Sequence, residues 1–132
     1  MKKPIGQQIK KVVAELSKFP FVKAIYLFGS TQKGKATRIS DIDICVIDDE
    51  SFQLRERYKV YQYSEHPFDV SLFSQLSLPI QYEALKGDCI FCKDRQFIVD
   101  LKPKVWFEYF DMQPVWEEGL KIRKKAGHRV VS

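Results

Sequence analysis

The sequence predicts an α/β domain of the α+β type, in which helices flank a small β-sheet. Three observations support this prediction. Short runs rich in β-branched and aromatic residues alternate with segments whose apolar residues recur at helical spacing. The chain has 132 residues, 45% hydrophobic and 30% charged, which suits one globular domain with a modest core. No apolar run approaches the roughly 20 residues that cross a bilayer.

The first elements are a helix and a strand. Residues 21–28 are β-branched and aromatic, which predicts a strand that Gly29 ends. Ser30 is a good N-cap for a short helix, which Gly34 would end. Before this strand, helical spacing predicts a first helix from the apolar residues Ile5, Ile9, Val12, Val13 and Leu16.

The middle of the chain predicts two further strands around a helix. Residues 41–47 alternate in polarity and then become continuously apolar, as a strand does. Residues 48–51 form a polar break, and Ser51 is expected to cap a helix running towards Tyr63. Residues 66–73 read as the next strand.

The last third of the chain is predicted to be mainly helical. A helix is expected around residues 80–86 and a strand around residues 88–92, and the pattern is helical from Asp94 onwards. Pro103 and Pro114 predict breaks in this last helix. Its apolar stripe consists of Ile98, Leu101, Val105, Tyr109, Met112, Trp116 and Leu120.

A phosphate-binding turn is predicted where the first strand meets the short helix. Unpaired backbone N–H groups and the positive end of a helix dipole converge at a helix start, which makes it an anion site. Gly29 would let a phosphate approach the backbone, and the Ser30 hydroxyl can donate to a phosphate oxygen. The Gly-Ser pair by itself is common and is more typical of an ordinary strand-to-helix turn with a capping serine.

Two carboxylates open the next strand. Alternation places Asp41 and Asp43 on one face, roughly 6.6 Å apart along the strand. At an effective dielectric of about 20, two unpaired charges at that separation repel by about 2.5 kcal/mol, and a cation would relieve this repulsion. Oxygen ligands without an imidazole or thiolate set indicate magnesium or manganese. Taken alone, the pair also fits a strand end whose polar face is wetted by solvent.

A third carboxylate, Asp69, lies inside the aromatic-rich strand of residues 66–73, where strand propensity disfavours aspartate. If this strand pairs beside the strand of Asp41 and Asp43, the three carboxylates can meet at two metal ions. A solvent-facing aspartate on an edge strand is the alternative. Only the combination of the turn with the three carboxylates is specific.

This combination resembles the DNA polymerase β-like nucleotidyltransferase superfamily, and its length and layout resemble the minimal nucleotidyltransferases, which are often paired with HEPN-domain proteins. The resemblance implies a small mixed sheet flanked by helices. It also implies a single domain over residues 1–132, with a core at about 20–95 and a C-terminal helical segment at about 94–126. The residues that match the motif are Gly29, Ser30, Gly34, Ser40, Asp41, Asp43 and Asp69.

The resemblance also implies a two-metal mechanism with Mg²⁺, which Mn²⁺ can replace. One ion, held by Asp41, Asp43 and Asp69, would activate an acceptor hydroxyl. The second, held by Asp41 and Asp43, would bind the triphosphate and stabilise the pyrophosphate leaving group. The expected nucleotide-binding residues are Gly29, Ser30, Lys33 and Ser40. The residues Thr31-Gln32-Lys33 replace the small and arginine-containing residues frequent at this turn, and Lys33 would act as a compact point charge.

By the same resemblance, the expected reaction moves AMP from ATP, or the monophosphate of another nucleoside triphosphate, to a partner. A HEPN-type toxin is the expected acceptor, with this chain as its antitoxin, and a homo-oligomer is the other assembly considered. A catalytically idle fold that neutralises a partner protein or binds RNA is the alternative function. A third possibility keeps the enzyme but makes a small molecule or an RNA end the acceptor.

The net charge of +5 is unevenly distributed. Before Asp41, nine lysines and arginines stand against Glu15 alone. Lys33, Lys35 and Arg38 lie between the turn and the carboxylates, where they can attract a triphosphate or an RNA. A solubilising surface is the alternative explanation. The N-terminal residues lack a signal-peptide core, so we expect a cytoplasmic protein that does not contact a membrane.

The three cysteines include a Cys89-x-x-Cys92 pair, a spacing that zinc and redox sites use. Positions three apart on a regular strand face opposite ways, and no second ligand pair follows. We therefore expect reduced, buried cysteines. His66 and His128 are too isolated to form a ligand set.

The C-terminal segment holds more aromatic residues than one stripe needs, which predicts a second apolar face that docks another subunit. Packing of these side chains on the sheet is the alternative. The residues are Trp106, Phe107, Tyr109, Phe110 and Trp116.

Overall fold

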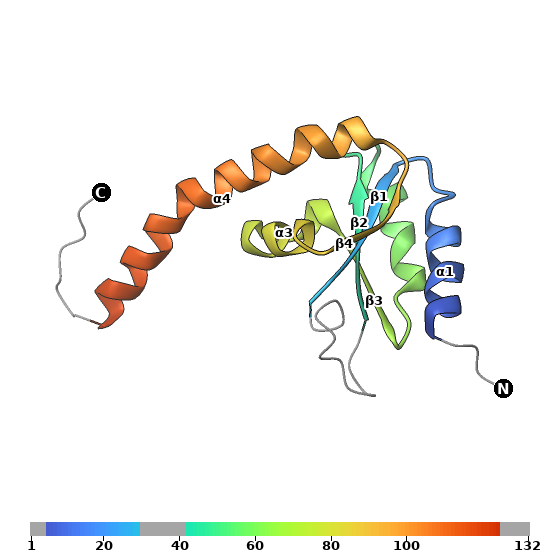
Figure 1. The fold of residues 1–132 in the computed structure, drawn as a ribbon, viewed down its shortest axis with the longest axis horizontal. Helices are drawn as coiled ribbons and strands as arrows, with labels where there is room; N and C mark the ends of the chain where they lie inside the picture. Colours follow the sequence, from blue (N-terminus) through green and yellow to red (C-terminus); the bar gives the residue numbers. More distant parts are fainter. Residues whose placement is uncertain (1–4, 30–41, 125–132) are drawn as a thin grey trace.

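The computed structural model describes residues 5–29 and 42–124, with side chains described as far as residue 112 (Figure 1). In these ranges the α-helices are α1 (Ile5–Leu16), α2 (Leu54–Arg57), α3 (Leu78–Leu85) and α4 (Arg95–Lys124). The strands are β1 (Val22–Phe28), β2 (Ile42–Asp48), β3 (Phe68–Leu72) and β4 (Asp88–Cys92). Two 3₁₀ helices, η1 (Tyr58–Tyr63) and η2 (Phe73–Gln75), flank β3.

The four strands form one mixed sheet in the order β3-β2-β1-β4. β1 is antiparallel to both β2 and β4, whereas β2 is parallel to β3. β2 and β1 are therefore central, and β3 and β4 are the two edges. A small mixed sheet flanked by helices confirms the predicted fold class.

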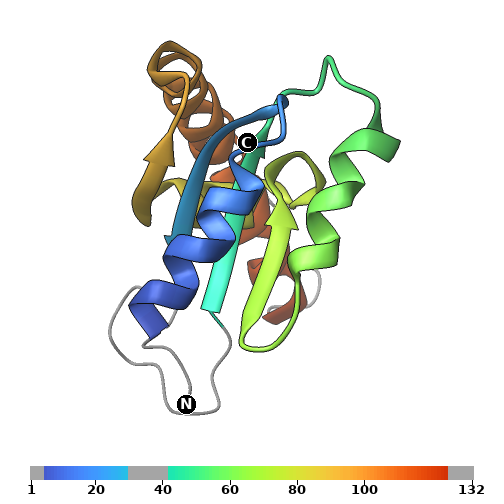
Figure 2. The ribbon, with the colours of Figure 1, turned by 90° about the vertical axis from the view of Figure 1, so that its right-hand side faces the viewer.

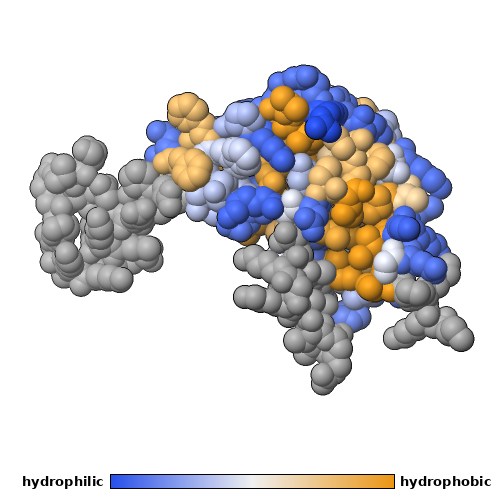
Figure 3. Space-filling model, in the orientation of Figure 1, coloured by the Kyte–Doolittle hydropathy of each residue, from blue (hydrophilic) through white to orange (hydrophobic). Residues whose placement is uncertain are grey.

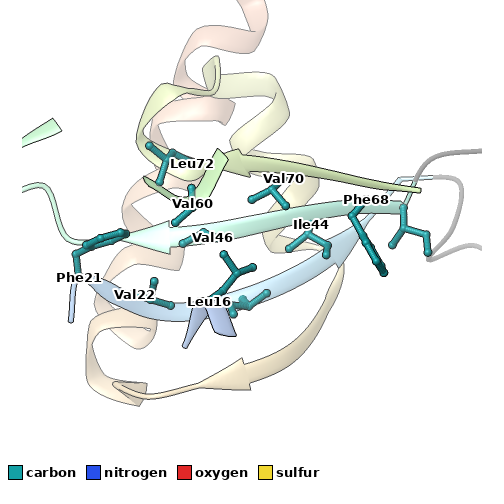
Figure 4. Packing of buried hydrophobic residues seen from close by; sticks show 11 residues of the cluster. Leu16, Phe21, Val22, Ile44, Val46, Val60, Phe68, Val70 and Leu72 are labelled. Atoms are coloured by element: carbon teal, nitrogen blue, oxygen red, sulfur yellow. The ribbon is translucent and has the colours of Figure 1, made fainter. Parts of the chain in front are cut away.

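Each face of the sheet packs against its own layer of helices, because side chains alternate between the faces along a strand. On one face, Leu16 of α1 and Val60 of η1 pack with Ile44 of β2 (Figure 4). On the other face, Leu85 of α3 and Val105 of α4 belong to a second buried cluster. Figure 2 views the molecule with α1 in front of the sheet and α4 behind it.

A buried ion pair between Asp48 and Arg57 stabilises the C-terminal end of β2. The Arg57 guanidinium donates to Asp48 Oδ2 at 2.8 Å and to the Phe52 carbonyl at 2.9 Å. The Ser74 hydroxyl donates to the same Oδ2 at 2.6 Å, and the Ser74 N–H donates to Asp48 Oδ1 at 3.0 Å. Both charged residues are at least nine-tenths buried. The network ties β2 to the α2 helix and to η2.

The segment after β2 differs from the prediction. Ser51 does not cap a helix: α2 begins at Leu54 after Gln53, and the Ser51 N–H instead donates to Asp49 Oδ1 at 2.9 Å. The side chain of Asp49 thus closes a local turn in place of a helix cap. The expected single helix towards Tyr63 is a four-residue α-helix followed by a 3₁₀ helix.

The predicted breaks at Pro103 and Pro114 are wrong, because α4 is continuous from Arg95 to Lys124. An interior proline loses one backbone hydrogen bond and costs about 3 kcal/mol. Burial of Ile98 and Val105 on either side of Pro103 offsets that cost. Figure 1 shows α4 passing over α3 and extending away from the sheet. Within residues 5–29 and 42–124, no helix combines the length and apolarity that a membrane span requires.

The prediction of buried cysteines holds only for Cys45, since Cys89 and Cys92 are exposed on β4. The prediction that these two face opposite ways is also wrong. A register shift in β4 opposes Cys89 to Tyr26 and Cys92 to Ala24, which are two residues apart on β1. Such a bulge adds one residue to β4, so both cysteines lie on the same face.

Candidate active site

The predicted site residues fall partly inside the described chain. Gly29, Asp43 and Asp69 are described. The others lie outside the described residues, together with the short helix expected after the turn; they are Ser30, Lys33, Gly34, Ser40 and Asp41.

Gly29 ends β1 and lies directly against the side chain of Asp43. Its φ is +85°, a left-handed conformation that side-chain-bearing residues rarely adopt. A Cβ atom built on Gly29 would lie 2.5 Å from Asp43 Oδ2. The backbone at residue 29 therefore has to be glycine for two reasons, its conformation and the close approach of this carboxylate.

Asp43 and Asp69 occupy the same position in adjacent parallel strands. Their Cα atoms are register partners between β2 and β3, and neighbouring strands lie about 4.8 Å apart. The Ile42 N–H donates to the Pro67 carbonyl at 2.6 Å and holds the two strand starts together. The two strands that carry the aspartates therefore pair side by side, as the three-carboxylate site requires.

The face on which the two aspartates lie follows from the apolar residues around them. Ile42 and Ile44 of β2, and Phe68 and Val70 of β3, belong to the cluster under α1. By alternation, the intervening aspartates lie on the α3–α4 face of the sheet. Asp43 is half-buried and Asp69 is exposed.

Phe28 lies on the same face of the sheet, next to Asp43 on the side away from Asp69. It is the register partner of Asp43 on β1 and packs at the edge of the α3–α4 cluster. Asp43 thus lies between an aromatic residue and a second carboxylate. Phe28 was not among the predicted site residues, because a strand-ending phenylalanine has no sequence signal beyond its apolar character.

Gly87 is a second residue that sequence reasoning missed. A Cβ atom at this position would collide with the Leu27 carbonyl oxygen and lie 3.0 Å from the Phe28 Cβ. Gly87 therefore allows the start of β4 to approach β1 just before the glycine turn. Its position between a predicted helix and a predicted strand was the available signal.

The side chains at this end of the strands suit a hard divalent cation. β1 ends here at Phe28, directly before Gly29, while β2 and β3 both start here with an aspartate as their second residue. Two carboxylates at strand spacing repel each other unless a cation lies between them, and their oxygens are ligands that Mg²⁺ prefers. Among the described residues no group of three or more potential ligands occurs. Asp41, outside the described residues, precedes β2 by one position.

Solved structures share this fold over most of the chain. A chain of a mutant MntA-HpeT toxin–antitoxin complex superposes with a TM-score of 0.65 at 22% identity, over 92% of this chain and 98% of that one. A toxin–antitoxin complex with AMP-PNP gives 0.61 at 22% identity, over 89% and 95%. A complex of a tri-AMPylated Shewanella oneidensis HEPN toxin with its MNT antitoxin gives 0.55 at 20% identity, over 89% and 92%.

These identities are low, so the structures establish the fold. One of them, the complex of a HEPN toxin with an MNT antitoxin, is the kind of pairing that the sequence resemblance named. No curated protein matches the chain. The family model described as polymerase beta nucleotidyltransferase matches residues 8–96, which include β1, β2 and β3 with Gly29, Asp43 and Asp69. The chain therefore belongs to the polymerase β nucleotidyltransferase family.

Proposed function

We propose that this chain is an Mg²⁺-dependent nucleotidyltransferase that transfers AMP from ATP to a hydroxyl group of a HEPN-type toxin and so acts as its antitoxin. The observation that carries the proposal is the arrangement at the end of β1 and the starts of β2 and β3, where Asp43 lies against Gly29 and beside Asp69. The AMP-PNP complex and the AMPylated HEPN toxin among proteins of the same fold support the choice of nucleotide and acceptor.

The described carboxylates suit different parts of this reaction. Asp43 is half-buried and confined by the Gly29 backbone, so it is the more rigidly placed ligand. Asp69 is exposed, which leaves it accessible to an acceptor. We assign Asp41, Asp43 and Asp69 to the metal site. An Mg²⁺ ion held there would supply charge stabilisation to the triphosphate and would lower the pKa of the acceptor hydroxyl.

The remaining residues bind and orient the nucleotide. In this proposal the backbone at Gly29, the hydroxyls of Ser30 and Ser40 and the Lys33 ammonium hold the phosphates. The acceptor oxygen forms a bond to the α-phosphorus while the bond to the bridging oxygen breaks and pyrophosphate leaves. The hydroxyl proton passes to Asp69. Alignment and charge stabilisation, rather than covalent catalysis, then account for most of the rate.

The partner is proposed to bind the exposed aromatic face of α4. Trp106, Phe107 and Phe110 are exposed, Phe107 by 76%, and Figure 3 shows apolar residues along α4. Tyr109 stacks on Tyr82 of α3 with ring centroids 4.0 Å apart, which anchors this part of α4. The side chain of Trp116 lies outside the described residues. We further propose a single domain with its core at about 20–95 and a helical segment at about 94–126.

The test is transfer of label from ATP to a purified HEPN-type partner in the presence of Mg²⁺. Label on the α-phosphate should appear on the partner, whereas label on the γ-phosphate should leave with pyrophosphate. Transfer of the γ-label would show phosphoryl transfer and contradict the proposal. A partner that binds without becoming labelled would favour the idle module, and label on added RNA would favour the RNA acceptor.

A further inference from the structure

A pair of exposed thiols lies on the β4 edge of the sheet, outside the candidate active site. Cys89 and Cys92 are three residues apart in sequence, but their partners on β1, Tyr26 and Ala24, are two residues apart. The bulge therefore compresses three residue steps of β4 into the length of two. It also brings both side chains to the α3–α4 face.

This compression shortens the expected separation of the two cysteine Cα atoms. Two residue steps along a strand span roughly 6.6 Å, whereas three steps would span roughly 10 Å. Disulfide-linked residues have Cα atoms about 4.4–6.8 Å apart, so three regular steps exceed this range, whereas the compressed span falls at its upper end.

The Cys89 side chain already leans towards Cys92. Its Sγ lies 3.5 Å from the Phe91 carbonyl oxygen, which belongs to the peptide bond that leads into Cys92. Both thiols are free and exposed. Desolvation at the sheet and the nearby Cys89 raise the pKa of Cys92. Burial, and next the charge of Cys89, raise the pKa of Tyr26 to about 12, which places Cys89 against the Tyr26 side chain.

The residues around Cys89 and Cys92 favour a disulfide over a structural metal site. Structural zinc takes four protein ligands, and within residues 5–29 and 42–112 no third or fourth ligand joins these two thiols. The two sulfurs together provide what a disulfide requires.

We propose that Cys89 and Cys92 form a reversible intramolecular disulfide by exchange with a small disulfide such as oxidised glutathione. One thiolate attacks a glutathione sulfur, forming a mixed disulfide and releasing one glutathione thiolate. The second cysteine loses its proton and attacks the protein-bound sulfur, which expels the other glutathione thiolate. Two protein thiols are oxidised, one small disulfide is reduced to two thiols, and the two protons pass to the released thiolates.

The test treats the full chain with glutathione buffers of increasing oxidation, followed by alkylation of free thiols after unfolding, tryptic digestion and mass spectrometry. Cleavage at Lys86 and Lys93 places both cysteines on the peptide 87–93, and cleavage at Arg38 and Arg55 places Cys45 on a separate peptide. We expect peptide 87–93 to lose two hydrogens and take up no alkyl group. Cys45, which is buried, should remain reduced and serve as an internal control.

Single variants and the denatured chain complete the experiment. Cys89→Ser and Cys92→Ser should each abolish the two-hydrogen loss and accumulate a glutathione adduct on the remaining cysteine. The folded chain should form the bond at a several-fold lower proportion of oxidised glutathione than the denatured chain, because the bulge holds the thiols together. Glutathione adducts or alkylated thiols alone on the wild-type peptide, or equal oxidation of the folded and denatured chains, would overturn the proposal.

Discussion

The side chain of Asp43 occupies the space into which a Cβ atom on Gly29 would project, with Oδ2 2.5 Å from that position. The glycine that ends β1 and the first described carboxylate of the site therefore constrain each other. This contact gives a prediction about the glycine that rests on the position of the Asp43 side chain.

Gly29→Ala should impair the site directly. The substitution strains a backbone with φ of +85° and displaces Asp43, so we expect a cost of about 1–2 kcal/mol in stability and loss of Mg²⁺-dependent ATP binding. Calorimetric titration and thermal unfolding measure the two effects. Gly6→Ala is the matched control, because a Cβ at Gly6 meets nothing within 4 Å and α1 should tolerate or gain from alanine. Unchanged ATP binding in Gly29→Ala would contradict the assigned role of this contact.

Substitution of the carboxylates should separate binding from chemistry. Asp41→Asn and Asp43→Asn should each lower AMP transfer by at least about 10²–10³-fold, the effect of losing one transition-state contact. Asp69→Asn should lower transfer similarly but spare triphosphate binding, because Asp69 is assigned to one ion only. Asp100→Asn, an exposed position on α4, is the control. Wild-type transfer by Asp43→Asn in the labelling assay would exclude the mechanism.

ATP binding should require a divalent cation. The Asp43 and Asp69 carboxylates repel the triphosphate unless Mg²⁺ or Mn²⁺ lies between them. Titration calorimetry with Mg²⁺, with Mn²⁺ and with a chelator measures the difference. Equal affinity with and without the chelator would show that the carboxylates do not hold a metal.

Removing Arg57 should destabilise the fold without touching the site. Arg57→Met leaves Asp48 buried without its ion-pair partner, and breaking such a pair costs about 3–5 kcal/mol. Denaturant unfolding should show this loss, and Asp48→Asn added to Arg57→Met should restore part of it. Arg55→Met, on the exposed side of the same helix, should change stability little. A loss in Arg57→Met no larger than in Arg55→Met would show that the pair is not important for folding.

The aromatic face of α4 should contribute to partner binding rather than to stability. Phe107→Ala removes the most exposed side chain of this face, and interface anchors commonly contribute about 2 kcal/mol or more. Association with the HEPN-type partner should weaken by at least about tenfold in sedimentation experiments, with little change in melting temperature. Tyr58→Ala, an exposed aromatic on η1, is the control. Equal weakening by Tyr58→Ala would point to a different surface.

The strands could be predicted because their burial imposes a pattern on the sequence. β2 is central, so its apolar run is nearly continuous, whereas β3 is an edge strand whose Asp69 alternates with the buried Phe68 and Val70. Side-chain periodicity specifies the face of the sheet on which each residue lies, but it does not specify which strands are neighbours. The contact of Gly29 with Asp43, and the register of Asp43 with Asp69, depend on strand order, which only the folded chain defines.

Other features depend on interactions that no local pattern encodes. The bulge before Cys92 has no sequence signature, so simple alternation placed the two cysteines on opposite faces. The continuity of α4 through Pro103 depends on packing against the sheet and α3, a tertiary effect that outweighs a local preference. Asp49 rather than Ser51 organises the turn after β2, although both residue types favour turns.

The parallel pairing of β2 and β3 has a consequence for how this protein can vary. The crossover of residues 49–67 can change in length or composition without altering the spacing of the two aspartates, provided that Ile42 still binds Pro67. A slip of β3 by a single residue is different in kind. It would turn Asp69 into the apolar layer under α1 and bring Phe68 or Val70 to the place beside Asp43. The separation of the carboxylates is therefore insensitive to loop evolution and highly sensitive to strand register.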